Sequence, residues 1–153
     1  RIRWGAYAVA AVANLDSPHM DMVVRVRGTD GGVRIERLRG RTVLVANGGR
    51  LPAGITLLRE AHMDDGVLDV AVIDTVGGVA GWSSLARQVL PPFAATYSDP
   101  GRALGRVTLR RGTEAVVRLA EPALVQVDGE LLAPTRALRA RLDAGALLVR
   151  RPD

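Results

Sequence analysis

Two short acidic segments of this chain hold residues that could do chemistry. The first is Asp64-Asp65-Gly66, which leads into an apolar, β-branched run typical of a strand. Two carboxylates beside a flexible glycine can bring side-chain and backbone oxygens together, and oxygen is the ligand that Mg²⁺ or Ca²⁺ prefers. The same residues also make an ordinary solvated turn, because Asp-Gly commonly closes a hairpin without any chemistry.

The second acidic segment is Asp128-Gly129-Glu130, which follows an alternating, strand-like pattern at residues 123–127. A glutamate just past a tight turn at the rim of a sheet can project into a cleft. There its carboxylate can accept a proton from a substrate hydroxyl, an effect worth about 10²- to 10⁴-fold in rate. The alternative is a plain hairpin turn with charges that face solvent, and the segment alone does not separate the two.

Other site chemistries find little support in the sequence. The chain has no cysteine and no lysine, which excludes disulfides, thiolate ligands and Schiff bases. His19 and His62 lack zinc-ligand spacing, and no serine lies in a Gly-x-Ser-x-Gly elbow. Walker and Gly-x-Gly-x-x-Gly phosphate loops do not occur. Aromatic residues make up only 3%, and the arginines are spread along the chain, so we expect no nucleic-acid partner.

Length and charge indicate one domain. A chain of 153 residues can bury roughly 70% of its unfolded surface, and 48% of these residues are hydrophobic. The net charge of +5 favours an anionic membrane surface or a phosphate group without specifying either. No apolar run reaches the roughly 18 residues of a membrane span, and no signal peptide is recognisable, so we expect a soluble, cytoplasmic protein. Because the sequence begins at Arg1 without Met, we expect residues 1–153 to be one domain of a longer protein.

The hydropathy pattern predicts a mainly β fold with about two helices. The alanine-rich residues 4–15 and the helical spacing at residues 79–90, before Pro91-Pro92, predict the helices. Alternation and turn residues predict about nine short strands, with a glycine- and proline-rich loop at residues 47–54. This pattern is typical of a mostly antiparallel β-sandwich or open barrel. The predicted strands are residues 21–27, 33–38, 42–46, 68–73, 106–110, 115–119, 123–127, 136–141 and 146–150.

The order of these segments resembles the C-terminal domain of bacterial diacylglycerol-kinase-like and sphingosine-kinase-like lipid kinases. The resemblance runs from Gly5-Ala6-Tyr7 through Asn47, residues 61–70 and residues 125–130 to Ala144-Gly145-Ala146-Leu147. In that family an N-terminal lobe binds ATP through a Gly-Gly-Asp-Gly-Thr loop, and a C-terminal β-sandwich lobe completes the cleft and holds the acyl chains. The resemblance implies that this chain is the second lobe of a two-lobe kinase, with the nucleotide-binding lobe absent from it.

Roles for individual residues follow from the resemblance, position by position. Glu130 would accept the proton of the lipid hydroxyl, and Asp128 would shape the turn on the nucleotide side. Asp65 would bind a structural Mg²⁺ together with the backbone carbonyls of His62 and Val67. The implied reaction is ATP-dependent phosphorylation of a diacylglycerol or related lipid alcohol, by the full-length parent, at the inner membrane surface. The isolated chain would be inactive.

Two departures from the family pattern leave the substrate open. Arg50-Leu51-Pro52-Ala53-Gly54 stands where many relatives have a glycine run, and Arg59-Glu60-Ala61 stands where they have Pro-Asp-Ala. A non-catalytic lipid- or membrane-associating β-sandwich, in which the acidic turns are only turns, is the alternative function. A kinase relative that has lost activity is a third. Exposed sheet edges also leave a homodimer open.

Overall fold

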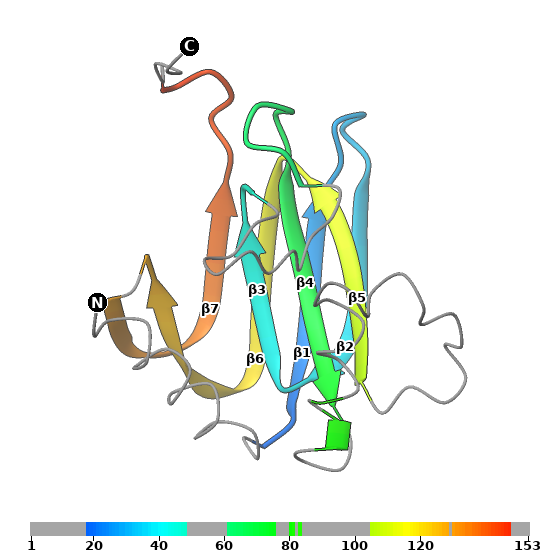
Figure 1. Ribbon diagram of the computed structural model, residues 1–153, viewed down its shortest axis with the longest axis vertical. Coiled ribbons are helices and arrows are strands. Elements are labelled where there is room, and N and C mark those ends of the chain that lie inside the picture. Colours follow the sequence, from blue (N-terminus) through cyan, green and yellow to red (C-terminus); the bar gives the residue numbers. More distant parts are fainter. Residues whose placement is uncertain are drawn as a thin grey trace.

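The computed structural model describes residues 18–48, 61–75, 80, 81, 83, 105–128 and 130–147. In these ranges the chain forms seven strands, and the predicted hairpin at residues 21–38 and the strand at residues 42–46 are confirmed (Figure 1). No helix among these residues is long and apolar enough to cross a membrane. The strands are β1 (Met20–Arg27), β2 (Val33–Gly40), β3 (Thr42–Ala46), β4 (Leu68–Thr75), β5 (Gly105–Gly112), β6 (Glu114–Val127) and β7 (Glu130–Arg141).

Several predicted boundaries are wrong. Residues 115–119 and 123–127 form the single strand β6, because pairing with β7 continues past Pro122 through two register shifts. A proline cannot donate to the ladder, and irregular pairing of this kind accommodates it. Strand β7 begins at Glu130, six residues before the predicted start, and Ala146 and Leu147 lie outside any strand.

The two predicted helices fall mostly outside the described residues. The helix predicted at residues 4–15 lies wholly outside them. Of the helix predicted at residues 79–90, only Ala80, Gly81 and Ser83 are described as helical, and the Ser83 hydroxyl donates to the Ala80 carbonyl at 2.9 Å. Most of the loop predicted at residues 47–54 and the end of the strand predicted at residues 146–150 are likewise not described.

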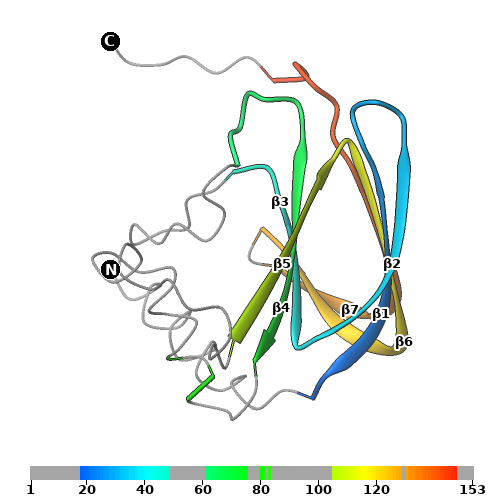
Figure 2. The same cartoon turned by 90° about the vertical axis from the view of Figure 1, so that its right-hand side faces the viewer.

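The strands form two antiparallel sheets that face each other. One has four strands in the order β2-β1-β6-β7, and the other has three in the order β3-β4-β5. Figure 2 shows the two sheets edge-on as separate layers. The described part of the chain is therefore a β-sandwich, as the alternating pattern predicts.

The core lies between the sheets and is built from aliphatic side chains. On β1, every second residue points inward, and Val24 is only 2% exposed. On β4, Val70 and Val72 meet this row from the opposite sheet. Each large side chain buried in this way contributes about 1.5–3 kcal/mol to folding. The outer face of the three-stranded sheet is also covered at Ala71, which is packed with Ala61 and is 0% exposed.

Two glycines let the chain pass from one sheet to the other. Strand β2 ends at Gly40, one residue before β3, and β5 ends at Gly112, one residue before β6. A Cβ atom on Gly112 would lie 2.2 Å from the Arg27 carbonyl oxygen, and one on Gly40 would lie 2.9 Å from the Ile73 carbonyl oxygen. No side chain fits at either place. These close approaches bring the end of β5 against β1, beside the acidic turn described next.

Candidate functional site

The Asp64-Asp65-Gly66 turn lies directly before β4, at the edge where β3 and β5 both end. Asp69 of β4 stands opposite Ala46 of β3 and Arg111 of β5. Gly66 has a φ of 74°, a conformation that glycine adopts without strain. The Val67 N–H donates to Asp65 Oδ1 at 3.0 Å, which closes a local turn of the kind that aspartate favours.

Arg111 ties this turn to the sheet. Its Nη2 donates to Asp65 Oδ2, and its Nε donates to Asp69 Oδ1 at 3.1 Å. Asp69 is only 3% exposed, so the guanidinium supplies charge to a carboxylate removed from water. Desolvation raises the pKa of Asp65, but donors from the Val67 backbone, Arg111 and the His62 backbone outweigh it and hold that pKa below its ordinary value. The Asp65 carboxylate is therefore ionised at neutral pH.

Asn47, which directly follows β3, lies at the same edge. Its Nδ2 donates to the Met63 carbonyl at 3.5 Å, and the next residue, Gly48, approaches the Met63 side chain. Arg111 is not predicted as a site residue by any motif, although it belongs to an Arg-Arg pair at the end of a predicted strand. Only the β4–β5 register shows that it faces two aspartates.

The oxygen atoms of this turn are ligands of the kind that Mg²⁺ prefers. A bound Mg²⁺ would compete with Arg111 for the Asp65 carboxylate. Among the described residues, no three acidic or histidine side chains come together to hold a metal ion. A cation here would therefore bind one carboxylate, that of Asp65, and backbone carbonyls such as those of His62 and Val67. It would share Asp65 with the guanidinium of Arg111, which already neutralises that carboxylate.

The Asp128-Gly129-Glu130 segment closes the β6–β7 hairpin. Val127 pairs with Glu130, which leaves a two-residue loop, and Asp128 has a φ of 49° in the left-handed region that such loops require. Asp128 and Glu130 are both exposed, and no described side chain forms an ion pair with either. The side chains of Leu124, Leu131 and Leu132, near the tip, are also exposed, by 66%, 68% and 47%. The tip is thus an acidic loop flanked by apolar side chains.

The described part of the chain does not bring the two acidic turns together. Ala144, just beyond the end of β7, lies next to Gly66, so the Asp65 turn sits at one end of the β6–β7 pair. Glu130 sits at the other end of the same strands. Strand β6 has 14 residues, so the path between the two ends is roughly 40 Å at about 3.3 Å per residue. Figure 1 shows the β6–β7 hairpin curling away from the loop that precedes β4. Among the described residues, Asp65 and Glu130 therefore do not face one crevice.

The fold and the two turns define a β-sandwich lobe that carries separate acidic sites at its two ends. Residues 1–150 match the sequence model of the YegS C-terminal NAD kinase beta sandwich-like domain. The chain belongs to that family, which confirms the predicted resemblance to the C-terminal part of diacylglycerol-kinase-like proteins.

Solved structures from Bacillus anthracis str. Sterne share the fold. A candidate diacylglycerol kinase aligns with a TM-score of 0.62 and 18% identity, over 91% of this chain and 44% of its own. A crystal structure named as a diacylglycerol kinase aligns with a TM-score of 0.56 and 17% identity, over 89% of this chain and 42% of its own. This chain therefore spans less than half the length of these structures. No curated protein matches the sequence.

Proposed function

We propose that this chain is the C-terminal lobe of an ATP-dependent kinase that phosphorylates a diacylglycerol-like lipid alcohol. The observation that carries the proposal is the family match over residues 1–150, in a chain that spans less than half of the similar structures. An N-terminal lobe in the parent protein would bind ATP, and the cytoplasmic enzyme would act at the inner membrane surface. The isolated chain would be inactive.

Glu130 is the group proposed to accept the proton of the lipid hydroxyl. Its exposed place at the hairpin tip supports this role, because a second lobe that packs on the apolar flanks Leu124 and Leu131 would cover the carboxylate. Asp128 would hold the tight turn through its left-handed backbone and face the nucleotide. The rest of catalysis would be positioning and charge stabilisation, as in other phosphoryl transfers.

Mg²⁺ is proposed at the Asp65 turn, where it would fasten the backbone around His62 and Val67. Its chemistry there is structural, because the Asp65 turn lies at the far end of β6 and β7 from Glu130. The Arg111 guanidinium also stabilises this turn, because it neutralises Asp65 and binds Asp69.

The test is lipid phosphorylation by the full-length protein over a panel of lipid alcohols with MgATP. Glu130→Gln is expected to lower kcat by about 10²- to 10⁴-fold, the effect of losing a positioned base. Glu121→Gln is the matched control, because Glu121 is an exposed glutamate of the same hairpin that pairs with Arg136 instead. Equal rates for wild type and Glu130→Gln would remove Glu130 from the mechanism. Tight MgATP binding by this chain alone, measured by calorimetry, would contradict the division into two lobes.

A non-catalytic, membrane-associating lobe is the second candidate function. It is favoured by the outer face of the four-stranded sheet, where the strand registers place Arg25, Arg37, Arg118 and Arg139 together. The two candidates differ in the parent sequence. A Gly-Gly-Asp-Gly-Thr segment within about 150 residues upstream, the length of one domain, supports the kinase, and its absence supports the module.

A further inference from the structure

The outer face of the four-stranded sheet gathers arginines from all four of its strands. Met22, Val24 and Val26 of β1 point into the core, so the residues between them point outward. Residues directly opposite each other in antiparallel strands share a face, which extends this outer row across the sheet. The arginines on it are Arg25 and Arg27 of β1, Arg37 and Arg39 of β2, Arg118 of β6, and Arg139 and Arg141 of β7.

Few acidic side chains oppose this charge. Asp21 and Glu114 are the carboxylates that the same registers place on this face among the described residues. Seven guanidiniums against two carboxylates leave five positive charges, which equals the net charge of the whole chain, +5. Among the described residues, this face therefore carries a formal excess of five positive charges.

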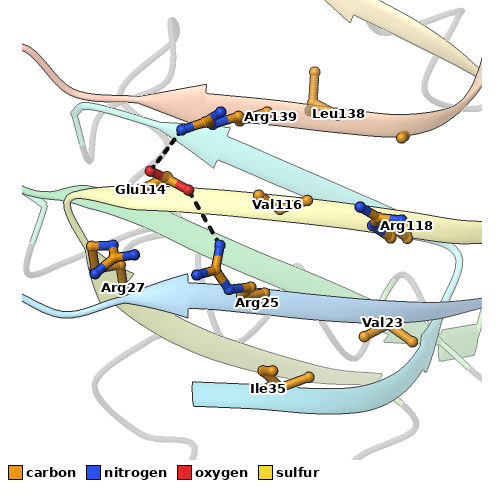
Figure 3. A pocket seen from close by; sticks show the side chains of 10 residues that line it. Val23, Arg25, Arg27, Ile35, Glu114, Val116, Arg118, Leu138 and Arg139 are labelled. Atoms are coloured by element: carbon orange, nitrogen blue, oxygen red, sulfur yellow. Dashed lines mark hydrogen bonds and ion pairs between the residues drawn. The ribbon is translucent and has the colours of Figure 1, made fainter. Parts of the chain in front are cut away.

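Only some of the arginines on this face form ion pairs with carboxylates of the chain. Glu114 accepts from Arg139 Nη2 at 3.1 Å and from Arg25 Nη1 at 3.5 Å, as Figure 3 shows. The hydrogen bond from Arg139 lowers the pKa of Glu114 and outweighs desolvation, so this carboxylate stays ionised. Arg141 pairs with Asp143 at 2.9 Å. No described carboxylate forms an ion pair with the remaining four, Arg27, Arg37, Arg39 and Arg118, and all four are exposed.

Aliphatic side chains lie between the arginines. Val23, Ile35 and Val116 line a shallow hollow together with Arg25, Arg118 and Arg139 (Figure 3). Ile35 is 63% exposed, so this apolar surface is open to solvent. Guanidiniums beside exposed aliphatic groups match the boundary of a bilayer, where phosphates lie above the glycerol and acyl region.

We propose that this face docks the protein on an anionic phospholipid bilayer, with its unpaired arginines on lipid phosphates. The proposal names the surface by which the proposed lipid kinase would reach its substrate, and in that respect it rests on the proposed function. A second copy of the chain is a poor occupant, because two copies of this face would oppose like charges across a symmetric contact. Nucleic acid is also a poor occupant, since none of the described residues on this face is an aromatic residue that could stack on bases.

The test is co-sedimentation of the protein with vesicles of phosphatidylcholine alone, or mixed with phosphatidylglycerol, without ATP. Binding is expected only to the mixed vesicles and is expected to fall in high salt. Arg37→Gln with Arg118→Gln should weaken binding by about 25-fold, since each arginine near an anionic membrane contributes about fivefold. Arg34→Gln with Arg106→Gln is the control, because it removes equal charge from exposed sites off this face. Thermal unfolding of both variants checks that they are folded.

Each contrary result overturns the proposal. Equal weakening by the two double variants would show attraction to net charge without a defined face. Absence of binding to phosphatidylglycerol vesicles would remove the membrane as the occupant. Equally tight binding to duplex DNA, lost with the same two arginines, would assign the face to nucleic acid. Vesicle binding needs no catalysis, so it tests the docking face alone. Phosphorylation of a soluble short-chain diacylglycerol needs no membrane, so it tests the proposed kinase function alone.

Discussion

Gly112→Ala tests whether the close crossing between the sheets holds the site edge in place. The added Cβ would lie 2.2 Å from the Arg27 carbonyl oxygen and 2.6 Å from Val26 Cγ1. Unstrained carbon–oxygen contacts begin near 3.3 Å, so β1 and β5 must separate by roughly 1 Å. Overpacking of this kind costs about 1–3 kcal/mol. The shift also strains the hydrogen bond from the Thr113 N–H to the same oxygen, now 2.8 Å long, which contributes about 1 kcal/mol.

We therefore expect Gly112→Ala to lower the free energy of unfolding by about 3 kcal/mol and the Tm by roughly 6–12 °C. Urea unfolding followed by circular dichroism measures the first, and a thermal scan measures the second. Gly31→Ala is the matched control, because nothing lies within 4 Å of its Cβ position and only its φ of 81° is unfavourable. That torsion costs about 1–2 kcal/mol. A loss for Gly112→Ala no larger than that of the control would refute the steric argument.

Three further outcomes are expected. Adding MgCl₂ should raise the Tm of Arg111→Gln more than that of wild type, because the variant lacks the guanidinium that competes with Mg²⁺ for Asp65. Equal rises in Tm would show that Arg111 and Mg²⁺ do not compete. The hydrogen bond from Arg110 lowers the pKa of Glu36, so this pair should stabilise the fold above the ordinary pKa of 4.5 and lose that effect as the pH falls below it. In urea unfolding, the free energies of unfolding of Glu36→Gln and wild type should therefore converge in acid. A constant difference between them at all pH values would contradict this. Val70→Ala should cost about 2–3 kcal/mol in the same assay, since Val70 is 1% exposed, and Val33→Ala, at 44% exposure, should cost little; similar losses would contradict the assigned core.

Much of the sandwich could be predicted because the alternation of apolar and polar residues that indicates a strand lies within the strand itself. The alternation at residues 21–27 and 33–38, with the glycines between them, corresponds to the β1–β2 hairpin, and residues 42–46 correspond to β3. The division of β6 into two strands failed because Pro122 looks like a strand end in the sequence. In the structure, pairing with β7 carries the strand past it.

The sequence by itself also determined which side chains could carry charge and protons. Asp65 and Asp128 lie in turns and Glu130 directly follows one, as the neighbouring glycines predict, because turn chemistry acts over only a few residues.

Only the tertiary structure decided how distant segments share a surface. Strand β1 pairs with β6 across about ninety residues, and this register places Arg25 beside Glu114. The β4–β5 pairing puts Arg111 on Asp65, and the β6–β7 pairing places Glu130 at the opposite end of the lobe. Hydropathy says which face of a strand is buried, but the choice of partner strand comes from packing two whole sheets against each other. For that reason arginines that look scattered along the chain form one cationic face in the folded protein.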